Sequence, residues 1–219
     1  MNARDRAIIA DLERFRCMSR DDIAAIHFAN VSNAVTAANR TMLRLYRQGL
    51  VDRSTEFQPF VYFPADNAIK KNSAKIPHFI ELVRVYRDML AYAKPARFNV
   101  EVKYDKGLAE PDIFTIWKGS PLFIEVQRSA YTDRQMTDKI ARYEALYQSG
   151  KVHAEPWQPV NRKVFPALLI LTKTRYAVHS DNFAIVQAES IADFMRTMKQ
   201  PIINNERKTK QSGIKIRIG

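Results

Sequence analysis

Apolar residues recur at helical spacing in the first third of the chain and predict three helices. The first is expected over residues 4–16, where the inward positions are Ile8, Leu12 and Phe15. The second is expected over residues 20–28, after Ser19, because an acidic residue at Asp22 suits a capped first turn.

The third helix, over residues 32–48, divides by face, with Ser32 as its expected N-cap and Gly49 as its C-cap. Its apolar side carries Val35, Ala38, Met42 and Leu45. Its polar side contains no acidic residue and carries Asn33, Thr36, Ala37, Arg40, Arg44 and Arg47. Such a face suits a major groove, with Asn33 and Arg40 reading bases and Arg44 and Arg47 holding phosphates. The alternative is a solvated arginine face.

Two short apolar segments around a polar turn predict a hairpin over residues 49–63, which includes Arg53. The phrase RLYRQGLVDR resembles the end of the recognition helix and the first wing strand of winged helix-turn-helix proteins. The resemblance implies that residues 1–65 bind double-stranded DNA through Ser32, Asn33, Thr36, Arg40, Arg44, Arg47 and Arg53. Residues 66–76 are polar and basic and are expected to form a linker.

Helix and strand patterns alternate over residues 77–203. Helices are predicted over 77–92, 132–148 and 190–198, and strands over 97–104, within 110–127, and over 164–172 and 183–188. The order α-β-β-β-α-β, with one further strand and helix, indicates an α/β domain with a mixed sheet.

The hairpin of residues 110–127 carries Asp112, Glu125 and Gln127 among apolar neighbours. A type II′ turn at Gly119-Ser120 would set Asp112 opposite Gln127, and opposed residues share a face. We therefore expect the three side chains to converge. Two close carboxylates repel unless a proton or a cation lies between them, and Mg²⁺ or Mn²⁺ prefers oxygen ligands. The alternative is that Asp112 caps the hairpin and Glu125 pairs with a lysine at the sheet edge.

Pro111-Asp112, followed after a hairpin by Glu125-Val126-Gln127, resembles the motif of the PD-(D/E)XK nuclease superfamily. The resemblance implies a restriction-endonuclease-like fold in which Asp112 and Glu125 bind Mg²⁺ or Mn²⁺. Gln127 stands where that motif has a lysine, so the charge that would stabilise an anion is missing. Glu81 is expected to fill the additional acidic position of the superfamily, with Glu101 as the alternative.

A narrower set of motifs resembles the replication-relaxation family of plasmids, phages and conjugative elements. It comprises the winged helix and then His78, Pro111-Asp112, Glu125, Gln127, Lys139 and Tyr143. Lys139 and Tyr143 lie one helical turn apart, so Lys139 is expected to point at the acidic site and supply the missing charge. The alternative is a surface lysine over a packing tyrosine.

The composition favours a polyanionic partner, since 35 Lys and Arg against 23 Asp and Glu give a net charge of +12. The single cysteine, Cys17, excludes an internal disulfide and fits a cytoplasmic location. The four histidines lack zinc-type spacing, and no apolar run predicts a membrane span or signal peptide. The basic tail, residues 204–219, is expected to form an edge strand or a DNA-binding arm.

Three functions remain open from the sequence. The first is DNA binding in replication or mobilisation of a genetic element, with replication or mobilisation proteins as partners and a nuclease-like domain that need not cleave. The second is a metal-dependent endonuclease that uses Asp112, Glu125, Gln127, Lys139 and Glu81. The third is a transcriptional regulator whose second domain forms a homodimer or senses a ligand.

Overall fold

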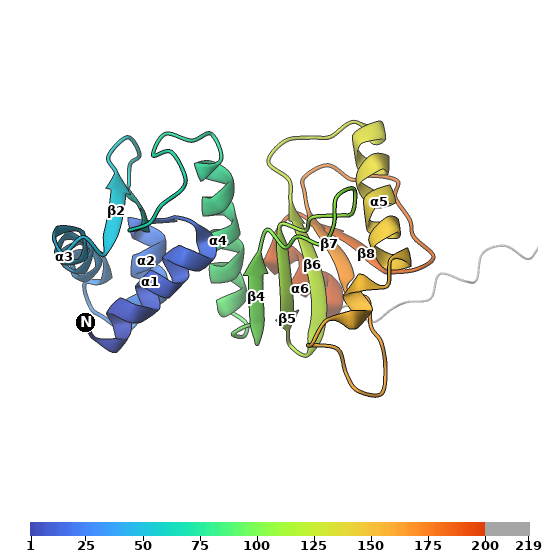
Figure 1. The fold of residues 1–219 in the computed structure, drawn as a ribbon, viewed down its shortest axis with the longest axis horizontal. Helices are drawn as coiled ribbons and strands as arrows, with labels where there is room; N and C mark the ends of the chain where they lie inside the picture. Colours follow the sequence, from blue (N-terminus) through green and yellow to red (C-terminus); the bar gives the residue numbers. More distant parts are fainter. Residues whose placement is uncertain (200–219) are drawn as a thin grey trace, which may run out of the picture.

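The computed structural model describes residues 1–199, so the predicted basic tail lies outside the described residues. The chain is a mixed α/β protein with two lobes, and helix α4 lies between them (Figure 1). No described helix has the length and the apolar character needed to cross a membrane.

The first lobe holds three helices and a small antiparallel sheet. The helices are α1 (Ala3–Phe15), α2 (Arg20–His27) and α3 (Ala34–Arg47). The hairpin strands are β2 (Val51–Ser54) and β3 (Val61–Pro64), and β1 (Met18–Ser19) pairs with β3 to give the order β1-β3-β2. The sequence did not predict β1, because two residues are too short to show alternation.

Helix α3 differs from its prediction at its start. Asn33, not Ser32, is the N-cap, and its Oδ1 accepts a hydrogen bond from the Thr36 backbone N–H at 3.1 Å. Ala38, Met42 and Leu45 are buried as predicted, but Val35 is 43% exposed. The buried stripe is centred nearer to Ala38 and Leu45, so Val35 lies at its edge and turns towards solvent.

The second lobe is a five-stranded sheet of order β4-β5-β6-β7-β8, built from β4 (Arg97–Val100), β5 (Ile113–Trp117), β6 (Ser120–Val126), β7 (Ala167–Leu171) and β8 (Ile185–Ala188). The first two pairings are antiparallel and the last two are parallel. Its helices are α4 (Ile76–Leu90), α5 (Asp133–Gln148), the short 3₁₀ turn η1 (Lys151–Ala154) and α6 (Ile191–Lys199). Strand β4 is shorter than predicted and stops before Glu101, where φ is 47°.

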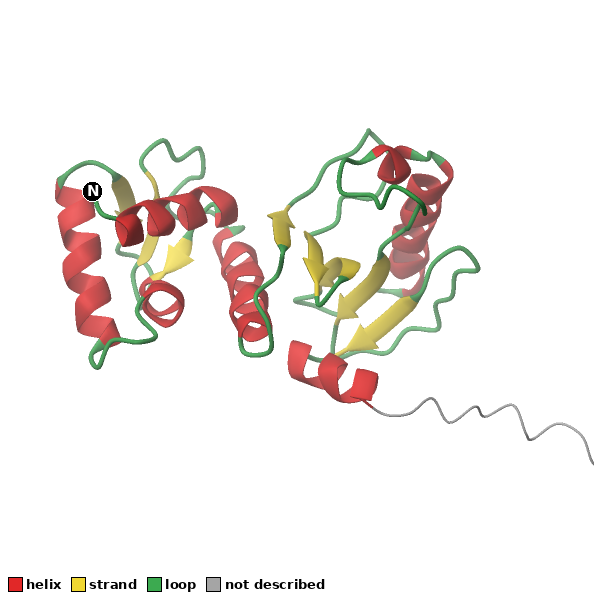
Figure 2. Ribbon diagram, turned by 90° about the horizontal axis from the view of Figure 1, so that it is seen from below, coloured by secondary structure: helices red, strands yellow, loops and turns green. Residues whose placement is uncertain are grey.

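Two apolar clusters cover the two faces of this sheet. Helix α5 packs on one face, over Phe114, Phe123 and Ile170. Helices α4 and α6 pack on the other, and Figure 2 shows α5 and α6 on opposite sides of the sheet. Tyr143 of α5 lies against Phe123, with 5.8 Å between ring centroids.

The cluster under α4 continues into the first lobe, so the two lobes share one core. Phe15 of α1, Tyr86 of α4 and Phe98 of β4 form its joint, with ring centroids 5.4 Å apart for Phe15–Tyr86 and 4.9 Å for Tyr86–Phe98. Buried aromatic pairs of this kind add to the free energy of area burial, which fixes α4 against both lobes.

The hairpin between β5 and β6 turns at Lys118-Gly119, one residue earlier than predicted. Trp117 pairs with Ser120 and Phe114 pairs with Phe123, so the predicted register, which set Asp112 opposite Gln127, is wrong. Lys118 and Gly119 have φ values of 50° and 80°, which is the I′ pattern that matches strand twist. Each residue of β5 therefore pairs with a β6 residue two positions earlier than predicted. Side chains alternate between the two faces of a sheet, so a shift of two residues leaves each of them on its predicted face. If this register is continued past Ile113, Asp112 comes opposite Glu125 in place of Gln127.

Candidate functional site

Glu125 is a buried carboxylate held by two side chains from α5. It lies on β6, is 3% exposed, and faces α5 together with Phe123. Lys139 Nζ lies 2.5 Å from its Oε2, and the Tyr143 hydroxyl donates to its Oε1 at 2.6 Å. Both contacts come from one face of α5, because the two residues are four apart in the helix. Thr132 and Gln135 form a capping box that fixes where α5 begins.

Asp112 is anchored beside Glu125, just before β5. Its Oδ2 accepts a hydrogen bond from the Val126 backbone N–H at 2.8 Å, which ties the aspartate to the end of β6. Its Oδ1 lies 3.3 Å from Nε2 of His78, in the first turn of α4. The fold thus brings His78, Asp112, Glu125, Lys139 and Tyr143 together from α4, β6, α5 and the loop before β5.

The two carboxyl groups have opposite pKa shifts. Burial and the negative charge of Asp112 raise the pKa of Glu125 to about 7, against the opposing effects of Lys139 and Tyr143. Burial also acts to raise the pKa of Asp112, but hydrogen bonds from His78 and Val126 outweigh it and lower that pKa. The hydrogen bond to Asp112 raises the pKa of His78 in return. Asp112 is therefore the ionised member of the pair at neutral pH.

The side chains present do not fit the divalent ion that the nuclease resemblance implies. All four carboxylate oxygens of Asp112 and Glu125 already have a donor from the chain, namely His78, Val126, Lys139 and Tyr143. Within residues 1–199 no group of three or more His, Cys, Asp or Glu side chains is arranged to hold a metal ion. The Lys139 ammonium group lies against the Glu125 carboxylate and balances part of the charge of the pair.

Gln127 directly follows β6, and its amide forms no hydrogen bond with Asp112 or Glu125, with which it was expected to converge. Its backbone N–H donates to the Leu171 carbonyl at 3.0 Å. Its side-chain Oε1 and Nε2 are buried, yet within the described residues neither has a hydrogen-bond partner. A buried amide of this kind costs about 1–3 kcal/mol.

The two candidates for the additional acidic position each pair with an arginine, and Glu101 also donates its backbone N–H to the Asp112 carbonyl at 2.9 Å. Glu81 forms an ion pair with Arg84 at 2.6 Å, one turn along α4. Glu101 lies 3.3 Å from Arg16, and its charge contributes to the raised pKa of His78. Glu101 is thus close enough to act on the site electrostatically, which its place on the polar side of a predicted strand did not reveal.

A cavity of about 520 Å³ opens beside Gln127, at the carboxyl ends of β6 and β7. Helix α4 lines it with Glu81, Arg84 and Arg87, and the start of α6 closes its other side. Crevices outside the carboxyl ends of parallel strands are common ligand sites in open α/β sheets. Arg128 and Lys173, which also line it, are both at least partly exposed.

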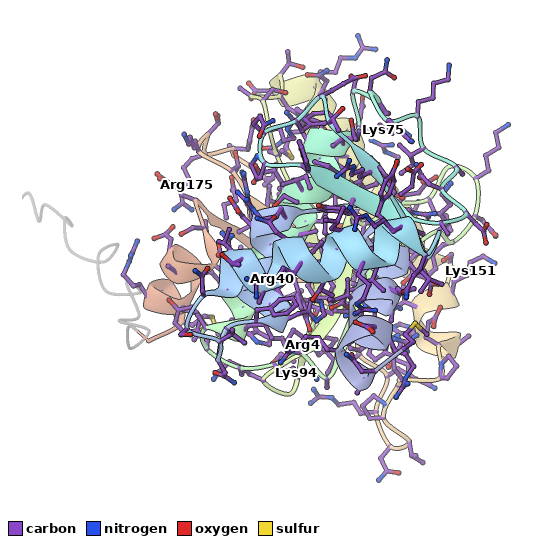
Figure 3. The ribbon with its side chains drawn as sticks, turned by 90° about the vertical axis from the view of Figure 1, so that its left-hand side faces the viewer. Arg4, Arg40, Lys75, Lys94, Lys151 and Arg175 are labelled. Carbon is purple, nitrogen blue, oxygen red and sulfur yellow. The ribbon has the colours of Figure 1, made fainter. Side chains whose placement is uncertain are left out.

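The second candidate surface is the solvent face of α3, at the end of the molecule away from the sheet (Figure 1). Figure 3 looks onto this end, with α3 in front and Arg40 on it. Arg40 and Arg47 are exposed and form no side-chain hydrogen bond or ion pair within residues 1–199. Arg44 differs, because its Nη2 lies 2.6 Å from the buried Asp5 of α1. Ser32 is exposed in the turn before α3.

Asn39 and Arg20 join this surface, although the sequence did not single them out. They line a shallow cavity of about 280 Å³ between α3 and the hairpin, together with Leu43, Arg53 and Phe60. The Arg53 guanidinium stacks 4.6 Å from the Tyr46 ring centroid and 5.3 Å from that of Phe60. Asn39 lies one turn after Val35, which the sequence pattern placed on the apolar side of the helix. Asn39 would have been predicted on the outer face only if Val35 had been predicted to be exposed.

Comparison of the chain with family models, curated proteins and solved structures finds no match.

Proposed function

We propose that this protein binds double-stranded DNA through α3, with the first lobe acting as a winged helix-turn-helix domain. One observation carries the proposal: the outer face of α3 presents Thr36, Asn39, Arg40 and Arg47 without an acidic residue in the helix. Small and polar side chains admit a helix to the major groove, and arginines beside them pair with phosphates or guanine edges.

The hairpin after α3 supports the same proposal. In a winged helix the wing lies beside the recognition helix and contacts the DNA backbone. Here β2 and β3 form that hairpin, and Arg53 is held on it by stacking against Tyr46 and Phe60. A guanidinium with a fixed position loses little rotamer entropy on binding a phosphate. The net charge of +12 adds sequence-independent attraction.

We further propose that the second lobe is a PD-(D/E)XK-like domain of the replication-relaxation type, in a protein that acts in replication or mobilisation of a genetic element. Its antiparallel hairpin, the crossover through α5 and the adjacent Asp112 and Glu125 support this reading. The Glu125–Lys139 contact favours a second lobe that only contributes binding contacts over one that cleaves DNA with a metal ion. A transcriptional role would use the same α3 surface.

The experiment compares Arg40→Ala and Arg47→Ala with Arg134→Ala in binding a labelled duplex by fluorescence anisotropy over a salt series. Arg134 is exposed on α5, far from α3, and its removal changes the net charge equally. We expect each α3 variant to weaken binding about fivefold or more and to reduce the slope of log K against log salt by about one.

The control variant should match the wild type in slope. Equal losses in all three variants would mean that net charge alone attracts DNA, and unchanged affinity in the α3 variants would remove α3 from the interface. Incubation of supercoiled DNA with the wild type and Glu125→Ala, with Mg²⁺, Mn²⁺ or EDTA, tests cleavage separately. Metal-dependent cleavage by the wild type that is lost in the variant would support the endonuclease hypothesis instead.

A further inference from the structure

The carboxylate pair of Asp112 and Glu125 has a cation from the chain beside it. Lys139 is mostly buried, with 14% of its side chain exposed, and its ammonium group lies 2.5 Å from Glu125 Oε2. A lysine is rarely buried to this extent without an acidic partner. Lys139 was expected to point at the acidic site and to supply the charge missing at Gln127, and the carboxylate that it contacts is Glu125.

The charge of Lys139 acts on both carboxylates. It opposes the raised pKa of Glu125 and contributes to the lowered pKa of Asp112. A divalent ion bridging the two residues would act in the same direction on both groups. Lys139 therefore supplies the compensation that a bridging metal would otherwise provide.

The remaining donors leave little room for a metal as well. Tyr143 donates to Glu125 Oε1 at 2.6 Å, and Val126 and His78 hold the oxygens of Asp112. Mg²⁺ requires near-octahedral oxygen ligands at about 2.0–2.1 Å and gives up water reluctantly. An ion at Glu125 Oε2 would have to displace an ammonium group that is already desolvated.

We propose that Lys139 is the resident cation of this site, and that its charge keeps Mg²⁺ and Mn²⁺ out. The Asp112–Glu125 pair is then a latent metal site, which opens when the positive charge at residue 139 is removed. This inference concerns the protein alone and holds whether or not α3 binds DNA.

The test measures Mn²⁺ binding to the isolated protein by electron paramagnetic resonance and by the shift of Tm, over a pH series that starts at the Glu125 pKa of about 7 and rises, because removal of the Lys139 charge raises that pKa further. The variants are Lys139→Met, which removes the charge, and Lys139→Arg, which keeps it. Lys151→Met is the matched control, since Lys151 pairs with Asp105 on the surface at 2.7 Å. Lys139→Met combined with Glu125→Gln removes the carboxylate from the opened site.

We expect no Mn²⁺-dependent shift for the wild type, Lys139→Arg or Lys151→Met. Lys139→Met should bind Mn²⁺, and its Tm should rise by about 2–4 °C at an Mn²⁺ concentration about five times Kd. The double variant should lose that rise. If Lys139→Met does not fold, Lys139→Gln, which is neutral but keeps a hydrogen-bond donor, gives the same comparison.

Two outcomes would overturn the proposal. The first is a rise in the Tm of the wild type with Mn²⁺ that Glu125→Gln abolishes, since the metal would then bind alongside Lys139. The second is a folded, neutral variant at residue 139 that binds no Mn²⁺, which would make the ion pair a packing contact without a latent metal site.

Discussion

The Tyr143 hydroxyl donates a 2.6 Å hydrogen bond to Glu125 Oε1, and both side chains are buried. This bond favours the ionised carboxylate and so opposes the rise in the pKa of Glu125. Tyr143→Phe should therefore lower the free energy of unfolding by about 1–3 kcal/mol, measured by urea denaturation. The loss should be larger at pH 8 than at pH 5, because the pKa of Glu125 would rise further above 7 and its ionisation would cost more stability.

Tyr147→Phe is the matched control for that variant. Tyr147 lies one turn further along α5 and packs on Phe165, with 5.3 Å between ring centroids, and its hydroxyl has no hydrogen bond within residues 1–199. Its replacement should cost little at either pH. Equal losses in the two variants would show that the Tyr143 hydroxyl contributes only ordinary packing.

The His78–Asp112 contact predicts a pH dependence of stability. The pKa of His78 is raised above 6.5, so its stabilisation is complete below pH 6.5 and is lost as the pH rises through the folded pKa. The pKa of Asp112 is lowered from 3.8, so its stabilisation is present above pH 3.8 and is lost as the pH falls through the folded pKa. His78→Gln should cost about 1–2 kcal/mol near pH 5.5 and little near pH 9.

That prediction is checked by urea denaturation across the pH range, with His153→Gln alongside. His153 is half-buried against Tyr147, with 6.0 Å between ring centroids, and has no ion pair within the described residues. A cost of His78→Gln that is the same at both pH values would contradict a charged His78 in the folded protein.

Gln127 and Gln158 offer opposite predictions for one substitution. Gln127 has a buried amide with no partner within residues 1–199, whereas the Gln158 amide makes three hydrogen bonds, at 2.7–2.9 Å, to Val152 and Val164. Gln127→Met should leave the free energy of unfolding unchanged or raise it by about 1 kcal/mol, since no bond is lost. Gln158→Met should lower it by about 1–3 kcal/mol. A clear loss for Gln127→Met would mean that ordered water or a ligand satisfies its amide.

Arg44 is expected to act in folding more than in DNA binding. Its partner Asp5 is 2% exposed and also belongs to the capping box of α1. Arg44→Ala should lower the free energy of unfolding by about 1–3 kcal/mol, because a buried carboxylate loses its charged hydrogen-bond partner. Arg47→Ala should leave stability within about 0.5 kcal/mol of the wild type. Thermal and urea unfolding of both variants check this, and equal stability would return Arg44 to the DNA-contact surface.

The sequence by itself determined the order of the elements and the mixed α/β class. The α5 and α4 patterns are long and periodic, so local hydrophobic spacing places them within a few residues. The common face of Asp112 and Glu125 also followed from the sequence. The predicted turn between β5 and β6 was one residue too late, which shifts every cross-strand partner by two residues. Side chains in a strand alternate with a period of two, so this shift leaves Asp112 and Glu125 on the same face of the sheet.

Only the tertiary structure decided how charges far apart in the sequence are paired. Asp5 binds Arg44 across 39 residues, and Lys139, which was expected to point at the acidic site, contacts Glu125 and not Asp112, across 14 residues. Neither pairing has a local signal, because it depends on how one helix packs on another element. The exposure of Val35, and with it the place of Asn39 on the outer face, was decided in the same way, since the buried stripe of α3 is set by what the helix packs against.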